Sequence, residues 1–176
     1  SSNRQTLWKC HQFQWSRVII PFPTEGFLIV GGGAVGLTTA LSLALKDIPV
    51  TVLEAEKEVV KEYRGSTFHP PTLEILDDLG IGKYLIEKGI KAYTVQYRDR
   101  KEGLIAEFDL GRIKQYTRFP FRLQIDQYAL ALLLLEKLKS LSNVDVVFNA
   151  KVSNITNMET YVEVSTNSPD GSTRVF

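Results

Sequence analysis

Residues 31–36 read Gly-Gly-Gly-Ala-Val-Gly and carry the clearest chemical signal in the chain, because they fit the pattern G-x-G-x-x-G. Each glycine of this pattern has its own task. Gly31 permits a tight turn, Gly33 lets the backbone come close to a pyrophosphate, and Gly36 lets a helix lie close on a sheet. The pattern therefore predicts that this segment binds a dinucleotide through its pyrophosphate.

Glu54 adds to this signal, because an acid about 20 residues after the first glycine typically binds the adenosine ribose. Its carboxylate would repel a 2′-phosphate, so NADP is disfavoured here. We count the adjacent Ala55 among the cofactor-binding residues. The backbone amides of Ala34 and Val35, together with the helix dipole, would face the phosphates. The alternative is a glycine-rich turn beside a surface glutamate, and the pattern alone does not separate NAD from FAD.

Three short segments are expected to position these residues. Residues 27–30 form an apolar run typical of a strand buried in a parallel sheet. Residues 34–46 have the apolar spacing of a helix, and residues 50–53 are a second, β-branched apolar run. Residues 27–54 therefore predict a Rossmann-like βαβ unit, and the chain is assigned to the α/β class.

The rest of the chain predicts an antiparallel β-hairpin and a β-meander added to this unit. Pro71 and Gly80 mark the two ends of a helix. Asp126 precedes a long apolar helical pattern, where a cap is a better interpretation than a general acid. The further expected elements are a loop over 64–71, a helix over 83–88, hairpin strands over 93–98 and 104–110, a helix over 124–141, and strands over 146–152, 161–166 and 173–176.

Composition excludes several classes of protein. The 176 residues carry a net charge of +1 and are 44% apolar, the balance of a globular chain without an electrostatic footprint for nucleic acid. No apolar run approaches the roughly 18 residues of a membrane span. A single cysteine, Cys10, cannot form an internal disulfide, so the cytoplasm is the expected compartment. Residues 1–26 are expected to be a poorly ordered leader, and Arg4, Lys9 and Arg17 leave a mitochondrial transit peptide as the alternative.

From residue 27 onward the chain resembles the class A flavoprotein aromatic hydroxylases, the para-hydroxybenzoate hydroxylase family. The likeness is greatest to the branch that contains 3-(3-hydroxyphenyl)propionate hydroxylase. The motifs around Arg64 and Gln124 are more specific to this family than the glycine pattern. The resemblance rests on residues 28–37 with 52–56, 64–76 with 79–81, 96–100 with 106–110, and 121–127.

The resemblance implies that the cofactor is FAD. It places Arg64 near the FAD phosphates and ribityl chain, where a guanidinium can donate two hydrogen bonds to phosphate. It places Gln124 where a glutamine reaches the FAD backbone. The alternatives are a surface arginine and a helix-capping amide. The implied activity of the complete enzyme is hydroxylation of a phenolic substrate with NADPH or NADH and oxygen, and no residue of this chain is identified as a catalytic base.

Other polar residues are given structural roles. His69 lies between Phe68 and Pro70 in an expected loop, and Glu74, Asp77 and Asp78 are interpreted as a solvated helix face rather than a metal site. No spacing of cysteine and histidine suggests zinc.

The sequence departs from the family pattern in one respect, the second FAD motif. That Gly-Asp segment is not found, and Asp170-Gly171 is interpreted as a hairpin turn. The chain is therefore expected to be the first third to two-fifths of a hydroxylase with a foreign leader. Residues 27–176 would form an incomplete FAD-binding domain, with about 92–120 in the substrate-domain sheet. The alternative is a truncated, non-catalytic nucleotide-binding remnant. An NAD-dependent dehydrogenase is disfavoured, because a hairpin replaces further βαβ repeats after about residue 91.

Overall fold

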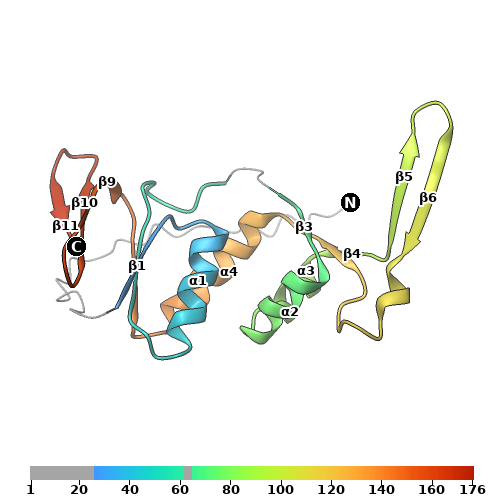
Figure 1. The fold of residues 1–176 in the computed structure, drawn as a ribbon, viewed down its shortest axis with the longest axis horizontal. Coiled ribbons are helices and arrows are strands. Elements are labelled where there is room, and N and C mark those ends of the chain that lie inside the picture. Colours follow the sequence, from blue (N-terminus) through green and yellow to red (C-terminus); the bar gives the residue numbers. More distant parts are fainter. Residues whose placement is uncertain (1–25, 62–64) are drawn as a thin grey trace, which may run out of the picture.

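The computed structural model describes residues 26–61 and 65–176. The expected leader, except for Gly26, lies outside the described residues, and so do its transit-peptide interpretation and Arg64. The molecule is elongated, with a small antiparallel sheet at one end and a long hairpin at the other (Figure 1).

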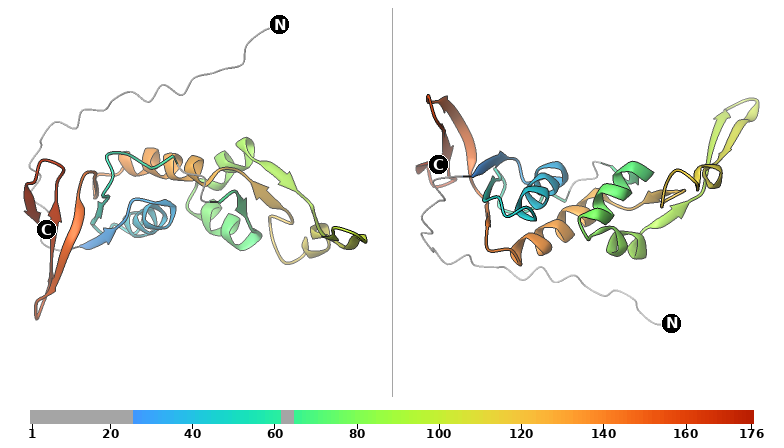
Figure 2. Two further views of the ribbon diagram at one scale, coloured as in Figure 1. Left: turned by 90° about the horizontal axis from the view of Figure 1, so that it is seen from above. Right: turned by 60° about the horizontal axis from the view of Figure 1, so that its bottom comes forward.

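A parallel three-stranded sheet forms one part of the molecule, in the order β1-β2-β8. Its strands are β1 (Phe27–Val30), β2 (Val50–Leu53) and β8 (Val144–Val147). Every residue of β2 is buried, because the strand lies in the middle of this sheet. Helix α1 (Ala34–Ala44) connects β1 to β2 and lies beside α4 (Gln127–Lys139) in all three views (Figures 1 and 2). The predicted βαβ unit is confirmed.

The segment after α4 differs from the expected single strand over 146–152. It is divided at Asn149, which adopts a left-handed φ of 56°. Asparagine tolerates this conformation, and a strand cannot continue through it. The first part is β8, which pairs in parallel with β2, and the second is β9 (Lys151–Asn157). The amide of Ala150 donates to the carbonyl oxygen of Glu54 (2.8 Å), so the division also ties the end of β2 to this turn.

A second sheet, in the order β3-β7-β4, was not predicted. It contains β3 (Thr67–Phe68), β7 (Arg122–Gln124) and β4 (Ile90–Ala92), paired antiparallel and packed beside α2 (Pro70–Asp78) and α3 (Gly82–Lys88). Strands of two or three residues show no alternation in sequence, which is why pattern analysis misses them. Both helices were predicted: each begins one residue earlier than expected, and α2 ends at Asp78, two residues before Gly80.

One hydrophobic core joins these parts. Leu37 and Leu41 of α1 meet Leu134 of α4, and the same cluster continues to Leu73 of α2 and Leu123 of β7. Helix α4 therefore contributes to both regions. Its start differs from the prediction, because residues up to Gln124 pair as strand β7 instead of joining the helix. No helix in the described part of the chain is long and apolar enough to cross a membrane.

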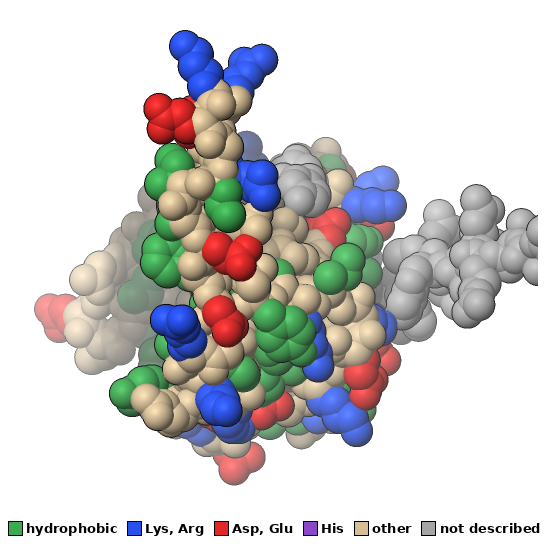
Figure 3. Space-filling view, turned by 90° about the vertical axis from the view of Figure 1, so that its right-hand side faces the viewer, with side chains coloured by type: hydrophobic (Ala, Val, Ile, Leu, Met, Phe, Trp, Pro, Cys, Tyr) green, Lys and Arg blue, Asp and Glu red, His purple; other side chains and the backbone are tan. Residues whose placement is uncertain are grey.

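The predicted hairpin is confirmed, and one of its faces carries two aromatic rings in contact. Strands β5 (Thr94–Asp99) and β6 (Gly103–Asp109) pair antiparallel, and the 3-10 helix η1 (Leu110–Ile113) follows. On one face Tyr97 and Phe108 make an edge contact with ring centroids 5.8 Å apart, although both remain more than half exposed. Figure 3 shows the hairpin standing out from the body, with basic side chains at its tip.

The predicted β-meander closes the chain, with strands β9, β10 (Val162–Asn167) and β11 (Thr173–Val175). All pairings are antiparallel, in the order β11-β10-β9. Val164 of β10 packs with Ala150 and with Leu53 of β2 in a second, smaller core. Asp170 and Gly171 lie in the turn between β10 and β11, as predicted.

Asp126 caps helix α4, because its carboxylate accepts a hydrogen bond from the Tyr128 amide (3.0 Å). We expect Asp126→Ala to lower the free energy of unfolding by about 1 kcal/mol, the usual cost of losing such a cap. Chemical denaturation measures this, with Glu136→Ala on the exposed side of the same helix as the control. Equal stability of Asp126→Ala and the wild type would contradict the capping role.

Candidate functional site

The turn between β1 and α1 has a backbone that only glycine fits well at two positions. Gly31 has a φ of +102°, a conformation that L side chains rarely adopt, and its amide donates to the Leu53 carbonyl oxygen (2.8 Å). A Cβ atom on Gly36 would overlap the carbonyl oxygen of Gly31 and lie 3.2 Å from its carbonyl carbon. The close approach of α1 to β1 therefore depends on both glycines.

Gly33 is different, because the space beside it is open. Its backbone is extended (φ −76°, ψ −179°), and a Cβ atom there would meet nothing within 4 Å. It occupies the N-cap position of α1 but has no side chain to cap the helix. The first hydrogen bond of the helix runs from the Leu37 amide to the Gly33 carbonyl oxygen (2.9 Å). The amides of Ala34, Val35 and Gly36 have no intrahelical acceptor and can donate to an anion.

The side chains of Ala34 and Val35 differ in their burial. Ala34 packs against the main hydrophobic core, whereas Val35 is 79% exposed. Because both residues lie in the first turn of α1, their backbone amides are the groups that they offer a ligand. The structure brings them together with Gly33 at the start of α1, as the sequence predicted.

Glu54 lies directly beside the glycine turn. The Gly32 amide donates to Glu54 Oε2 (2.6 Å), and the Glu56 amide donates to Glu54 Oε1 (3.0 Å). Each carboxylate oxygen has two lone pairs, so both oxygens can accept a further hydrogen bond from a ribose hydroxyl. The carboxylate is held before a ligand arrives, which reduces the entropy lost on binding. Ala55 follows as an exposed residue at the same edge.

Gly32 is a site residue that sequence analysis missed. A Cβ atom on Gly32 would lie 3.1 Å from both Cβ and Oε2 of Glu54, tighter than an ordinary contact. Glycine at this middle position therefore allows the carboxylate to approach the turn. The motif leaves the position unspecified, and the signal appears only when β1 and β2 are placed side by side.

Gln124 lies in strand β7 rather than at the start of a helix. Its side-chain oxygen accepts a hydrogen bond from Thr67 Oγ1 (2.9 Å), and its backbone partners are Thr67 and Ile90. The side-chain NH₂ group is the part that could donate to a ligand. Its role toward FAD, like that of Arg64, stays a prediction.

Three acids of α2 interact with the segment that precedes β7 instead of forming only a solvated face. Thr117 Oγ1 donates to Glu74 Oε1 (2.7 Å), and Arg118 pairs with Asp77 (2.8 Å) and Asp78 (2.6 Å). The hydrogen bond to Asp78 raises the pKa of the Arg118 guanidinium above its ordinary value. These contacts fix α2 against the chain that leads into Arg122 and Gln124.

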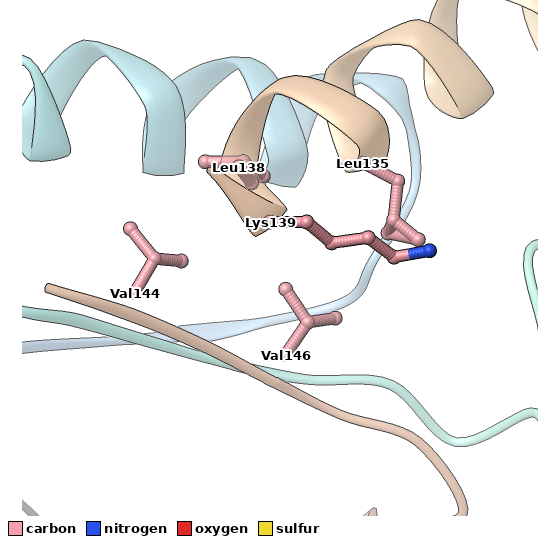
Figure 4. Close-up of a pocket in the computed structure, with 5 residues that line it drawn as sticks. All are labelled: Leu135, Leu138, Lys139, Val144 and Val146. Atoms are coloured by element: carbon pink, nitrogen blue, oxygen red, sulfur yellow. The ribbon is translucent and has the colours of Figure 1, made fainter. Parts of the chain in front are cut away.

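The hollow between α4 and β8 is too small for an organic ligand. Its volume is about 20 Å³, enough for about one water molecule. Figure 4 shows Leu135, Leu138 and Lys139 on α4 facing Val144 and Val146 on β8. This site is a packing gap of the parallel sheet.

The glycine turn and Glu54 can bind a ligand, and they fit the ADP half of FAD. The open space at Gly33 would accept a pyrophosphate, and the adjacent carboxylate would accept ribose hydroxyls. Within the described residues of this site, no nucleophile is paired with a base.

We expect Glu54→Ala to weaken FAD binding by roughly 1.5–3 kcal/mol, about a 10- to 150-fold rise in Kd, because hydrogen bonds to a charged group are lost. Titration of FAD into the apoprotein, followed by flavin fluorescence, measures this. Glu56→Ala removes an exposed carboxylate two residues away and serves as the control. An unchanged Kd in Glu54→Ala would make Glu54 a purely structural residue.

Comparisons with known proteins agree with this geometry. The family model described as "FAD binding domain" matches residues 25–175. Para-nitrophenol 4-monooxygenase from Pseudomonas sp. strain WBC-3 is 34% identical over 151 residues, and 6-hydroxy-3-succinoylpyridine 3-monooxygenase HspB from Pseudomonas putida is 34% identical over 125 residues. These matches cover 86% and 71% of this chain.

A solved structure shows the same fold. The crystal structure of p-nitrophenol 4-monooxygenase PnpA from Pseudomonas putida DLL-E4 superimposes with a TM-score of 0.80 at 35% sequence identity. The match covers 86% of this chain and 38% of that one. The chain likewise spans 38% and 32% of the lengths of the two sequence relatives.

Proposed function

This chain belongs to the FAD-binding domain family, and from that premise we propose that it is the FAD-binding portion of a monooxygenase that hydroxylates a phenolic substrate with NAD(P)H and oxygen. The observation that supports this most is the contact between the glycine turn and Glu54, together with 34% identity to para-nitrophenol 4-monooxygenase. The contact provides a site for the adenosine and pyrophosphate of FAD, and the identity relates the chain to an enzyme whose name states an aromatic substrate.

We assign each residue of the site to one part of the cofactor. The amides of Ala34 and Val35, beside the open space at Gly33, hold the pyrophosphate. Glu54, with Ala55 beside it, holds the adenosine ribose, and we assign Arg64 and Gln124 to the phosphates and the ribityl chain. FAD, when bound, supplies the redox chemistry that activates oxygen, and the protein supplies binding and orientation.

We assign about residues 92–120 to the sheet that covers the substrate. The support is the hairpin β5–β6. On its apolar face Tyr97 is 62% exposed and Phe108 is 54% exposed. An isolated two-stranded hairpin is marginally stable in water, so this face is suited to be covered. Hydrogen exchange of the β5 and β6 amides, with and without a phenolic substrate, checks this, and identical exchange would argue against the assignment.

We further propose a cytoplasmic location, because the chain contains a single cysteine, Cys10, and so no internal disulfide. Fractionation of the source cells with an antibody against residues 71–90 checks this location. Recovery of the protein in another compartment would overturn it.

The experiment for the function is a turnover assay with the FAD-loaded protein. NADPH and NADH are supplied in turn with a panel of phenols that includes 4-nitrophenol, and hydroxylated product is measured by mass spectrometry. Substrate-dependent oxidation with product formation supports the proposal. FAD binding without product from any phenol would instead identify a non-catalytic nucleotide-binding module, and the absence of FAD binding would remove the basis of the proposal altogether.

A further inference from the structure

A larger hollow lies between the start of α2, the 3-10 helix η1 and strand β7. Its volume is about 520 Å³, within the range of about 300–1,000 Å³ that small-molecule sites occupy. Most of its lining is apolar and includes Pro70, Ile113 and the ring of Tyr116. The polar groups at its wall include Arg122 and His69. The hollow thus combines an apolar wall with a fixed positive charge.

Arg122 is the unusual member of this lining. Its Nε atom is buried and has no hydrogen-bond partner in the described part of the chain. The backbone of Arg122 pairs with Ala92, between the buried residues Phe121 and Leu123, so the start of its side chain is fixed by the sheet. A buried donor without an acceptor costs free energy, more so in a charged group. Arg122 also lines the hollow, so an anionic oxygen bound there would meet the positive charge of its guanidinium.

Two other charged side chains near Arg122, Glu74 and Arg118, have hydrogen-bond partners of their own. Glu74, also in the lining, accepts hydrogen bonds from Thr117 Oγ1 (2.7 Å) and from the Arg118 amide (3.2 Å). Arg118 itself pairs with Asp77 and Asp78. Arg118 is itself a cation and cannot balance the charge of Arg122, and Glu74 is the one carboxylate in the described lining of the hollow. With one carboxylate in the wall, the hollow favours a monoanion over a doubly charged phosphate.

We propose that Arg122 binds the anionic oxygen of an aromatic molecule, a phenolate or a carboxylate, whose ring lies against the apolar wall of this hollow. A guanidinium donates charge-assisted hydrogen bonds to such an oxygen group, and a ring covers apolar side chains well. The site rests on the proposed function, since its ligand would be the aromatic substrate. It makes Arg122 a specificity-determining residue that selects the ionised ring.

Calorimetric titration of the FAD-loaded protein tests this, with 4-nitrophenolate and benzoate as the two anionic probes and neutral 4-nitrotoluene as the uncharged probe. Arg122→Gln is expected to raise the Kd of at least one anion about tenfold or more and to leave 4-nitrotoluene unaffected. Arg174→Gln, at an exposed arginine in strand β11, is the matched control and should behave as the wild type. The anion that loses affinity identifies the ligand as phenolate or carboxylate.

Two further measurements keep the outcomes distinct. Ile113→Trp, which fills the hollow and keeps Arg122, should also weaken anion binding, so a folding defect in Arg122→Gln does not decide the result. FAD titration of each variant separates the two proposals. The Arg122 site alone would be overturned if Arg122→Gln bound both FAD and the anions as tightly as the wild type does. If the wild type did not bind FAD, the proposed function would be overturned, and anion binding would be judged on the apoprotein.

Discussion

Gly33→Val is expected to abolish FAD binding while the protein keeps its fold. The backbone of Gly33 is extended, a conformation that valine adopts readily, and the space around a new Cβ atom is empty. No atom in the described part of the chain therefore lies within 4 Å of the added Cβ atom. The isopropyl group would instead occupy the space in front of the first amides of α1, where the pyrophosphate must lie.

Flavin fluorescence titration and circular dichroism of Gly33→Val together check this prediction. We expect no measurable FAD binding and an unchanged midpoint of thermal unfolding. Thr39→Val places the same kind of side chain on the exposed side of α1 and should bind FAD normally. Wild-type FAD affinity in Gly33→Val would refute the pyrophosphate site at this turn.

Gly36→Ala is expected to act on the fold itself. The added Cβ atom would overlap the Gly31 carbonyl oxygen and approach Ile29 Cγ2 to 3.4 Å, so α1 would have to move away from β1. Overpacking of this kind costs about 1–3 kcal/mol of stability. The loss should be visible in chemical denaturation, and FAD binding should fall with it, because the amides of α1 move too.

Thr39→Ala, another small substitution on α1, is the control for Gly36→Ala, since Thr39 is exposed. If Gly36→Ala unfolds at the same denaturant concentration as the wild type, α1 adjusts at no cost and the close approach is not required. The two glycine variants then separate two roles that the motif combines. One glycine leaves room for a ligand, and the other leaves room for the protein.

The sequence predicted the nucleotide-binding region well because its signal is local. A strand, a glycine turn, a helix and a second strand follow one another within residues 27–54, and each has its own pattern. The assignment to an FAD-binding family is confirmed by the match over residues 25–175. The hairpin and the helices α2 and α3 were also predictable, since glycine or proline lies at their turns.

Other features could not be predicted, because they depend on contacts between distant segments. The sheet of β3, β7 and β4 uses strands of two or three residues, too short to show a period. The separation of β8 from β9 depends on Asn149, whose left-handed backbone is stabilised where the Ala150 amide meets the end of β2. Neither the short strands nor the break at Asn149 can be predicted without knowing the strand that pairs with each segment.

The same distinction applies to the two sites. Residue types and spacing in the sequence were sufficient to predict a dinucleotide site at Gly31, Gly33, Gly36 and Glu54, because that chemistry requires them at those intervals. Only the tertiary structure showed that the Gly32 amide holds the Glu54 carboxylate. It also showed that Arg122, which lines a mostly apolar hollow, has a buried nitrogen with no partner among residues 26–61 and 65–176. Burial and hydrogen-bond satisfaction are properties of neighbours in space, and a sequence specifies those neighbours only through the completed fold.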